Sequence, residues 1–227
     1  MKFIVSGLSF SALVILGSLA SAQLAPPANY GQSHHWMERA AESGDVEAQY
    51  LFARRLENGV DIEIDIQSAA KWYAKAAIQG QMPAQFRLGE LYYSGRGVSR
   101  DLGQAAKWFK RAVESGSMIA AYNLGLMHER GSGVEKNFAR ASALYQRAAN
   151  AGIAEAQVSL AFLYAQGKGV LKDNGRALMW LEIARRSGIK VSSLVLNSLK
   201  SKMSPGEVES AIQMTLNRKE IIAQKSK

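Results

Sequence analysis

The side chains that could do chemistry are few in this sequence and widely spaced. The chain has 3 histidines and no cysteine, which excludes disulfides, thiolate metal sites and cysteine nucleophiles. His34 and His35 are adjacent, whereas two histidines that share a metal from one helix are usually four residues apart. The His-Glu-x-x-His, Gly-x-Ser-x-Gly, Walker and dinucleotide-binding motifs are all missing. The sequence therefore predicts no catalytic, cofactor or metal site.

Three glycine-rich loops of the form Gly-x-Gly-Val are the remaining candidates for a phosphate site. They begin at Gly95, Gly131 and Gly167. Each loop follows an expected helix, lacks the Lys-Ser or Lys-Thr ending of a nucleotide-binding loop, and recurs at the same position of its unit. We therefore predict that they are structural turns.

These loops belong to a pattern that repeats every 36 residues. A period of this length predicts a repeat array, and here each unit is an expected pair of short helices. An Asp or Asn precedes the second helix of each unit, where it can cap the first turn. A column of mostly tryptophan on that second helix is predicted to be core. Its members are Trp36, Trp72, Trp108, Leu144 and Trp180.

The unit from 84 to 116 carries nearly all of the pattern A-x₃-LG-x-LY-x₂-G-x-GV-x₂-D-x₃-A-x₂-WY-x-KAA-x-x-G. This pattern resembles the Sel1-like repeat, a relative of the tetratricopeptide repeat. The resemblance implies an all-α, right-handed α-solenoid with four A/B helix pairs, a leading helix and C-terminal capping helices. The first repeat departs from the pattern, because Ala53 and Asp61 stand at the positions that Gly89 and Gly97 occupy in the second repeat. We therefore predict a reshaped first loop from Val60 to Asp65.

The ends of the chain differ from the array in composition. Residues 1–22 read as a secretory signal peptide with cleavage after Ala22, because a short basic start precedes an apolar run and small residues. An uncleaved membrane anchor is the alternative, although the run is shorter than the ~20 residues of a span. Residues 23–33 are a predicted linker, 34–188 the array, and 189–227 capping helices with a basic tail. A periplasmic or secreted location follows from the signal peptide.

The C-terminal region is predicted to close the array. Residues 191–203 resemble a degenerate first helix, and Ser204 to Glu207 form a capping box before a last helix. On that helix, Val208, Ile212 and Leu216 are expected to share one apolar face.

The resemblance also implies where a partner would bind. In the related repeats, the first helix of each pair lines a concave groove and presents its variable positions there. Carried over by alignment, the candidate protein-binding residues are Arg54, Glu57, Glu90, Tyr93, Leu126, Glu129 and Phe162. The expected function is a non-enzymatic scaffold for a protein or peptide partner in the bacterial cell envelope. No cofactor, no nucleic acid and no stable membrane insertion after cleavage are expected.

Two further functional hypotheses stay open, and the first of them rests on the net charge of +9. Residues 189–227 carry 7 Lys and Arg against 3 Asp and Glu, so this tail could bind an anionic envelope polymer or could be a solvated end. A hydrolase acting on cell-wall or β-lactam bonds is the third hypothesis, since some cysteine-rich secreted members of the family have been described as β-lactamases. The absence of cysteine and of a well-placed Ser-x-x-Lys motif disfavours it.

Overall fold

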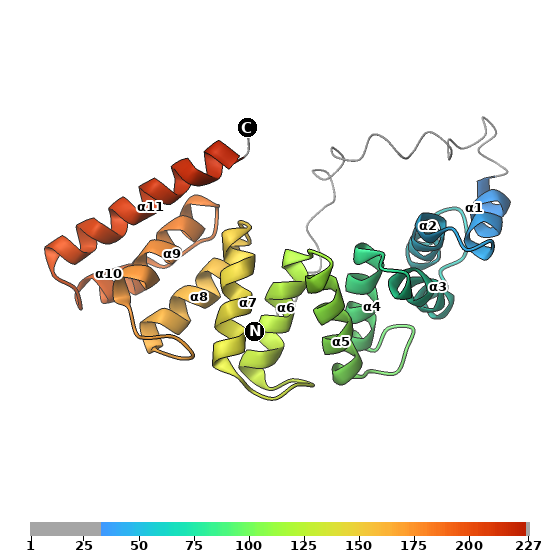
Figure 1. Ribbon diagram of the computed structural model, residues 1–227, viewed down its shortest axis with the longest axis horizontal. Helices are drawn as coiled ribbons and strands as arrows, with labels where there is room; N and C mark the ends of the chain where they lie inside the picture. Colours follow the sequence, from blue (N-terminus) through green and yellow to red (C-terminus); the bar gives the residue numbers. More distant parts are fainter. Residues whose placement is uncertain (1–32, 226–227) are drawn as a thin grey trace. The chain divides into compact units, whose positions relative to one another are not determined.

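The computed structural model describes the backbone of residues 33–225 and the side chains of residues 35–217. The predicted signal peptide and residues 23–32 of the predicted linker lie outside the described residues. Within them the chain forms eleven α-helices and no strand (Figure 1). Their bounds are α1 Ser33–Glu42, α2 Val46–Asn58, α3 Ile66–Ile78, α4 Met82–Ser94, α5 Leu102–Glu114, α6 Met118–Arg130, α7 Phe138–Asn150, α8 Ala154–Gln166, α9 Asn174–Arg186, α10 Ser193–Lys200 and α11 Pro205–Lys225.

The described residues divide into two compact units, unit 1, which ends at Ser115, and unit 2, which begins at Gly116. In unit 1, α2 pairs with α3 and α4 with α5, while α3 packs on α4 and α1 packs on α2. In unit 2, α6 pairs with α7 and α8 with α9, and α7 packs on α8. Both α10 and α11 pack against α9. Each unit therefore contains two of the predicted helix pairs.

The predicted caps define the ends of the paired helices. The side chain of Asp65, Asp101, Asn137 or Asp173 accepts a hydrogen bond from the backbone N–H three residues further on. These bonds satisfy donors that the first helical turn leaves unpaired. Each first helix ends before a glycine in the left-handed conformation, at 59, 95, 131 and 167. The prediction that the glycine-rich loops are turns is confirmed.

The core is built on a different aromatic column from the predicted one. The large side chains that are fully buried on the second helices include Tyr73, Phe109 and Tyr145, each one residue after the tryptophan column. Trp180 is buried, but Trp108 is only partly so, and Arg111 Cζ lies 4.7 Å from its ring centroid. Adjacent helical residues point about 100° apart, so the tryptophans lie at the edge of the buried face. The prediction holds fully for Trp180, whereas Trp72 and Trp108 are partly buried and pack against the core from its edge. The other two members, Trp36 and Leu144, are also partly buried.

The first loop keeps the geometry of its counterparts, so the prediction of a reshaped loop is wrong. Asp61 adopts the left-handed conformation of Gly97, with φ 56° against 69°. Arg55 stabilises this conformation, because its Nη2 lies 2.9 Å from Asp61 Oδ2. Arg55 also occupies the position of the buried Leu91. In the first repeat, an arginine and an aspartate that form an ion pair thus stand where the second repeat has an apolar residue and a glycine.

The C-terminal cap agrees with the prediction except for the buried face of α11. On α10, Leu196 and Leu199 are buried, as expected of a degenerate first helix. The capping box forms, with the Ser204 N–H donating to Glu207 Oε2 at 2.7 Å. On α11, among the side chains described up to residue 217, the buried residues are Ala211 and Thr215, whereas Ile212 and Leu216 are 37% and 39% exposed. The stripe that is buried is therefore rotated by about one residue from the predicted one.

Candidate protein-binding site

A tyrosine and a glutamate connect the two helices of the first pair in unit 1. The Tyr73 hydroxyl on α3 donates a hydrogen bond of 2.7 Å to Glu57 Oε2 on α2. The Tyr50 ring packs against the Tyr73 ring, with centroids 5.9 Å apart. Burial, reinforced by the Glu57 carboxylate, raises the pKa of Tyr73. The phenol therefore stays protonated and remains a donor to Glu57.

An ion pair on α4 lies next to this hydrogen bond. Arg87 Nη1 lies 2.9 Å from Glu90 Oε2, and the Glu90 side chain is only 12% exposed. Glu90 Oε1 is buried and has no hydrogen-bond partner. Burial raises the pKa of Glu90 even though Arg87 acts to lower it. For Arg87, burial acts to lower the pKa, but the Glu90 and Glu57 carboxylates outweigh this and raise it. The two pairs therefore interact electrostatically.

Two further arginines extend from the same place towards solvent. Arg54 is exposed, and its Cζ lies 5.7 Å from the centroid of the Tyr50 ring. Arg96, in the loop after α4, is 56% exposed and has its Nη1 3.9 Å from Glu57 Oε1. The carboxylates are thus buried while the guanidinium groups face outwards. We call Arg54, Arg87 and Arg96, with Glu57, Glu90 and Tyr73, the unit 1 polar cluster.

The structure brings three of the four predicted unit 1 residues together. Arg54, Glu57 and Glu90 all belong to the polar cluster. Tyr93 is half-buried, and its carbonyl accepts a hydrogen bond from Arg100 Nε at 3.1 Å, which ties it to the α4–α5 loop. Whether any of these residues contacts a partner stays a prediction.

Sequence reasoning missed Arg87 and Arg96. A signal was available for both, because neither belongs to a recurring column. The positions equivalent to Arg87 hold Leu51, Asn123 and Ser159. Arg96 is the variable residue of its Gly-x-Gly-Val turn. Alignment of the repeats does not show that α4 and its loop lie close to Glu57, because that proximity depends on packing between helix pairs.

Unit 2 repeats the buried half of the cluster and changes its outer half. The Tyr145 hydroxyl donates to Glu129 Oε2 at 2.5 Å, as Tyr73 does to Glu57. Two repeats on from Arg54 and Glu90 are Leu126, which is half-buried, and Phe162, which is 41% exposed. The three predicted unit 2 residues therefore comprise one hydrogen-bonded carboxylate and two apolar side chains. The corresponding surface of unit 2 is apolar where that of unit 1 is charged.

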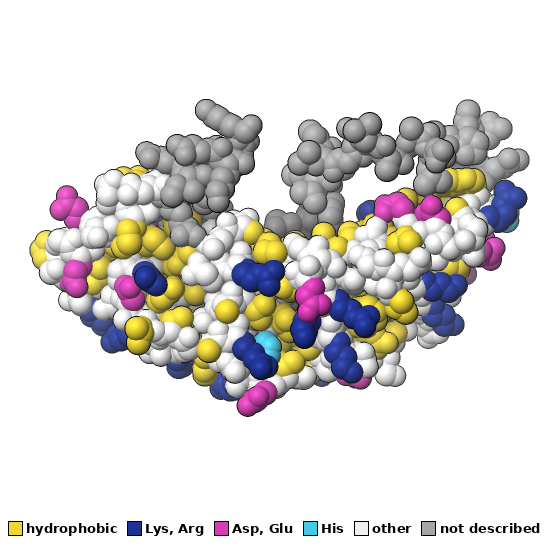
Figure 2. Space-filling model, viewed as in Figure 1, with side chains coloured by type: hydrophobic (Ala, Val, Ile, Leu, Met, Phe, Trp, Pro, Cys, Tyr) yellow, Lys and Arg dark blue, Asp and Glu magenta, His cyan; other side chains and the backbone are white. Residues whose placement is uncertain are grey.

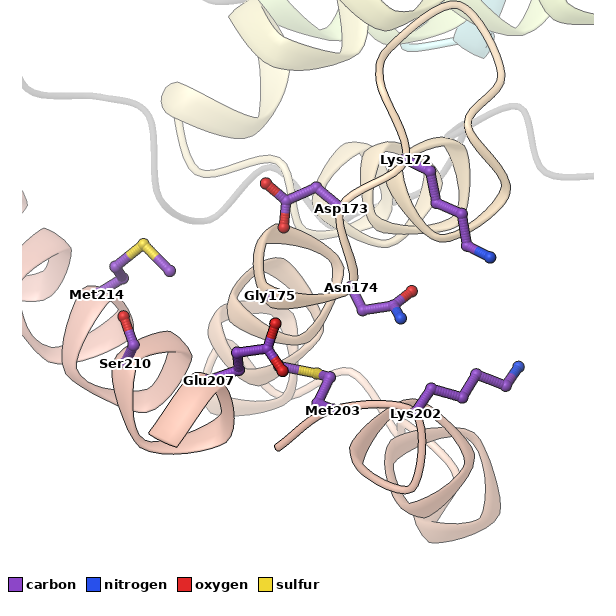
Figure 3. A pocket seen from close by; sticks show the side chains of 9 residues that line it. All are labelled: Lys172, Asp173, Asn174, Gly175, Lys202, Met203, Glu207, Ser210 and Met214. Atoms are coloured by element: carbon purple, nitrogen blue, oxygen red, sulfur yellow. The ribbon is translucent and has the colours of Figure 1, made fainter. Parts of the chain in front are cut away.

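A pocket of about 500 Å³ lies at the C-terminal end of unit 2 (Figure 3). It is formed by the start of α9, the α10–α11 connection and α11. Its two carboxylates, Asp173 and Glu207, each accept a backbone hydrogen bond at a helix start. Lys172 and Lys202 lie at its rim in the view of Figure 3. The acidic groups are therefore already used as caps.

The described residues contain neither a metal-binding cluster nor a helix that could span a bilayer. In that part of the chain, no group of three or more His, Asp or Glu side chains could hold a metal ion. None of the described helices is both long enough and apolar enough to span a bilayer.

The Sel1 repeat model matches five segments of the sequence, residues 12–45, 46–81, 83–117, 119–153 and 154–189. The chain therefore belongs to the Sel1 repeat family. The last four matches coincide with the helix pairs α2/α3 to α8/α9, and α1 forms the end of the first match. That first match begins within the predicted signal peptide. The fold is accordingly an all-α Sel1 repeat solenoid.

Solved structures support this assignment. A Sel1 repeat protein from Oxalobacter formigenes is 32% identical with a TM-score of 0.70, over 83% of this chain and 79% of that one. A protective antigen of uropathogenic Escherichia coli with an SLR fold is 28% identical with a TM-score of 0.71, over 82% of this chain. The match spans 41% of the length of that antigen. The comparison with curated proteins gave no match. Sel1 repeat proteins generally serve as non-catalytic scaffolds for protein–protein interaction.

The raised pKa of Glu90 predicts a pH dependence of stability. Its value in the folded chain lies above the ordinary 4.5, so protonation favours the folded state. The contribution of Glu90 to stability is then fully present below pH 4.5 and is lost as pH rises through the raised value. Glu90→Gln removes this dependence. We expect the free energy of unfolding of the wild type, minus that of Glu90→Gln, to increase as pH falls from neutral towards 4.5.

Urea denaturation at a series of pH values measures this difference. Glu63→Gln, which removes an exposed carboxyl from the α2–α3 loop, controls for the loss of one negative charge. A difference for Glu90→Gln that stayed constant or decreased over the same range would show that Arg87, and not burial, dominates the site.

Proposed function

We propose that this chain is an exported scaffold that binds a protein or peptide partner in the bacterial cell envelope through the exposed faces of its first helices. The family supports the scaffold role, and the amino-terminal sequence supports export. In this proposal the variable positions on α2, α4, α6 and α8 select the partner, while the recurring residues maintain the fold.

The observation that carries the proposal is the unit 1 polar cluster. Most recurring residues have a structural role as cap, turn or core. By contrast, the side chains of Arg54 and Arg96 do not recur, are exposed, and cap no helix. Arginine is among the residues enriched at the energetic centre of protein interfaces. Phe162 in unit 2, which is 41% exposed, is a large aromatic side chain of the kind that anchors such interfaces.

Site-specific photocrosslinking in cells tests the proposal. A photoreactive amino acid is placed at 54 and at 162 on first helices, and, as matched controls, at 107 and 143, which are exposed positions on second helices. We expect discrete protein adducts from 54 and 162 that are absent from the controls. Mass spectrometry then identifies the partner. Adducts from the second-helix positions alone would refute binding through the first helices.

The location needs its own measurement. Cell fractionation followed by sequencing of the amino terminus should recover the chain with the envelope or periplasm, beginning at Gln23. A chain recovered intact from the cytoplasm would remove export from the proposal while leaving the crosslinking result to decide the scaffold role.

A further inference from the structure

We infer that the unit 1 polar cluster recognises carboxylate side chains on an acidic, extended segment of a partner protein. The inference rests on the proposed scaffold function and specifies the chemistry of its partner. It concerns the surface formed by α2, α4 and the loop after α4.

The hydrogen-bonding groups of the cluster are unevenly distributed between its interior and its surface. Glu57 accepts from Tyr73, Glu90 pairs with Arg87, and both carboxylates are about nine-tenths buried. Arg96 is 56% exposed and its ion pair with Glu57 is long, at 3.9 Å. Among the described residues, no carboxylate lies within ion-pair distance of the exposed Arg54. The exposed carboxylate of Glu47, two turns before Arg54 on α2, already accepts a hydrogen bond from Gln81. A ligand that reaches Arg54 and Arg96 therefore meets mainly N–H donors.

Contacts within the cluster restrict the three arginines to different degrees. Glu90 holds Arg87 at 2.9 Å, the Tyr50 ring centroid lies 5.7 Å from Arg54 Cζ, and the long 3.9 Å pair with Glu57 restrains Arg96 more weakly. A free arginine side chain loses considerable rotamer entropy when it binds, and groups ordered in advance avoid part of that cost. Guanidinium groups bind carboxylates through two parallel hydrogen bonds. The cluster thus presents oriented donors suited to Glu or Asp side chains.

The surface around the cluster fits a short segment with a few carboxylates better than it fits a long polyanion. A polyanion binds along a continuous basic track. On the part of unit 1 that Figure 2 shows, Lys and Arg side chains are interspersed with apolar and acidic ones. The positions two repeats on from Arg54, Arg87 and Glu90 hold Leu126, Ser159 and Phe162. Two repeats on from Arg96 is Lys168, an exposed basic side chain, so unit 2 keeps a basic residue there but has no counterpart of Arg54. The combination of two exposed arginines therefore occurs in unit 1.

The test is a binding titration of the purified full chain with a fluorescent peptide of alternating Glu and Ser, blocked at both ends so that only side-chain carboxylates are offered. The matched Gln-Ser peptide is the ligand control. Arg54→Gln combined with Arg96→Gln removes the two exposed donors. Lys107→Gln combined with Arg140→Gln removes the same charge from exposed positions on second helices and is the protein control.

We expect the acidic peptide to bind the wild type, and the arginine double variant to bind it about tenfold or more weakly, as the loss of hydrogen bonds to charged groups requires. The control variant should bind like the wild type, and the Gln-Ser peptide should not bind detectably. Arg54→Lys combined with Arg96→Lys keeps the charge and loses the planar fork, so it should bind with intermediate affinity. It also serves if the Gln variant fails to fold, as monitored by circular dichroism.

Equal weakening in the arginine and control variants would overturn the inference, because it would show attraction by net charge alone. Equal affinity for both peptides, or no binding to the wild type, would overturn it as well. These results would leave the proposed function standing if position 54 still crosslinks to a partner. Loss of the first-helix crosslinks would refute the proposed function even if the acidic peptide bound.

Discussion

Phe109→Ala should lower the free energy of unfolding by about 3–5 kcal/mol, more than Trp108→Ala. Phe109 is fully buried between α4 and α5, where its ring lies 5.8 Å from that of Phe86 and fills the space beside Gly89. The neighbouring Trp108 lies at the edge of the same core, and its partial exposure leaves part of its contact surface in water. Truncation of Phe109 creates a cavity that the surrounding helices can close only in part.

Urea unfolding monitored by circular dichroism measures both variants. Because the core of each helix pair also supports its neighbour, the Phe109→Ala transition should involve α3 and α4 as well as α5, and hydrogen exchange of their amides should rise together. A larger loss for Trp108→Ala would mean that the tryptophan column carries the core after all.

Gly169→Ala should destabilise the chain by about 2–5 kcal/mol. Gly169 has φ 69°, and a Cβ built there would lie 2.2 Å from the Phe138 carbonyl carbon and oxygen. Because these are backbone atoms at the start of α7, they cannot move aside as a flexible side chain would. The cost therefore combines backbone strain with a steric clash between the α8–α9 loop and α7.

Gly131→Ala separates the backbone strain from the steric clash. Gly131 lies in unit 2, as Gly169 does. Gly131 has φ 74°, and a Cβ built there would lie 3.2 Å from Lys136 Cβ and 3.6 Å from the nearest backbone atom. We expect Gly131→Ala to cost mainly the strain, about 1–2 kcal/mol. Thermal or chemical unfolding of both variants measures the difference, and equal losses would show that the approach to α7 is not constrained.

Most of the fold could be predicted because residues next to each helix end determine where that helix starts and stops. Asp101 caps α5 and Gly95 ends α4, and both effects depend on neighbouring backbone groups. The choice between Trp108 and Phe109 as the core residue could not be made in this way. Both are aromatic and adjacent, and a rotation of the helix by about 100° exchanges their roles. That rotation is set by contacts with another helix.

The candidate site was predictable to a similar depth. Alignment identified the outward positions of the first helices, and so found Arg54, Glu57 and Glu90. It marked Arg87 and Arg96 only as residues that do not recur, because their roles depend on how closely α4 and its loop approach α2. Nor could it distinguish Glu57 as a buried acceptor from Arg54 as an exposed donor, since their exposure depends on Tyr73 and the neighbouring arginines.

The pairing of Arg55 with Asp61 has a consequence for how such an array can be rearranged genetically. Tandem repeats exchange segments by recombination between similar units. In the first repeat Arg55, which is 14% exposed, stands where the second repeat has a leucine. Its partner Asp61 stands where the second repeat has a glycine. A crossover between positions 55 and 61 would separate the two, bringing Arg55 together with a glycine or Asp61 together with a leucine. The repeats are similar in sequence, but their halves are not interchangeable.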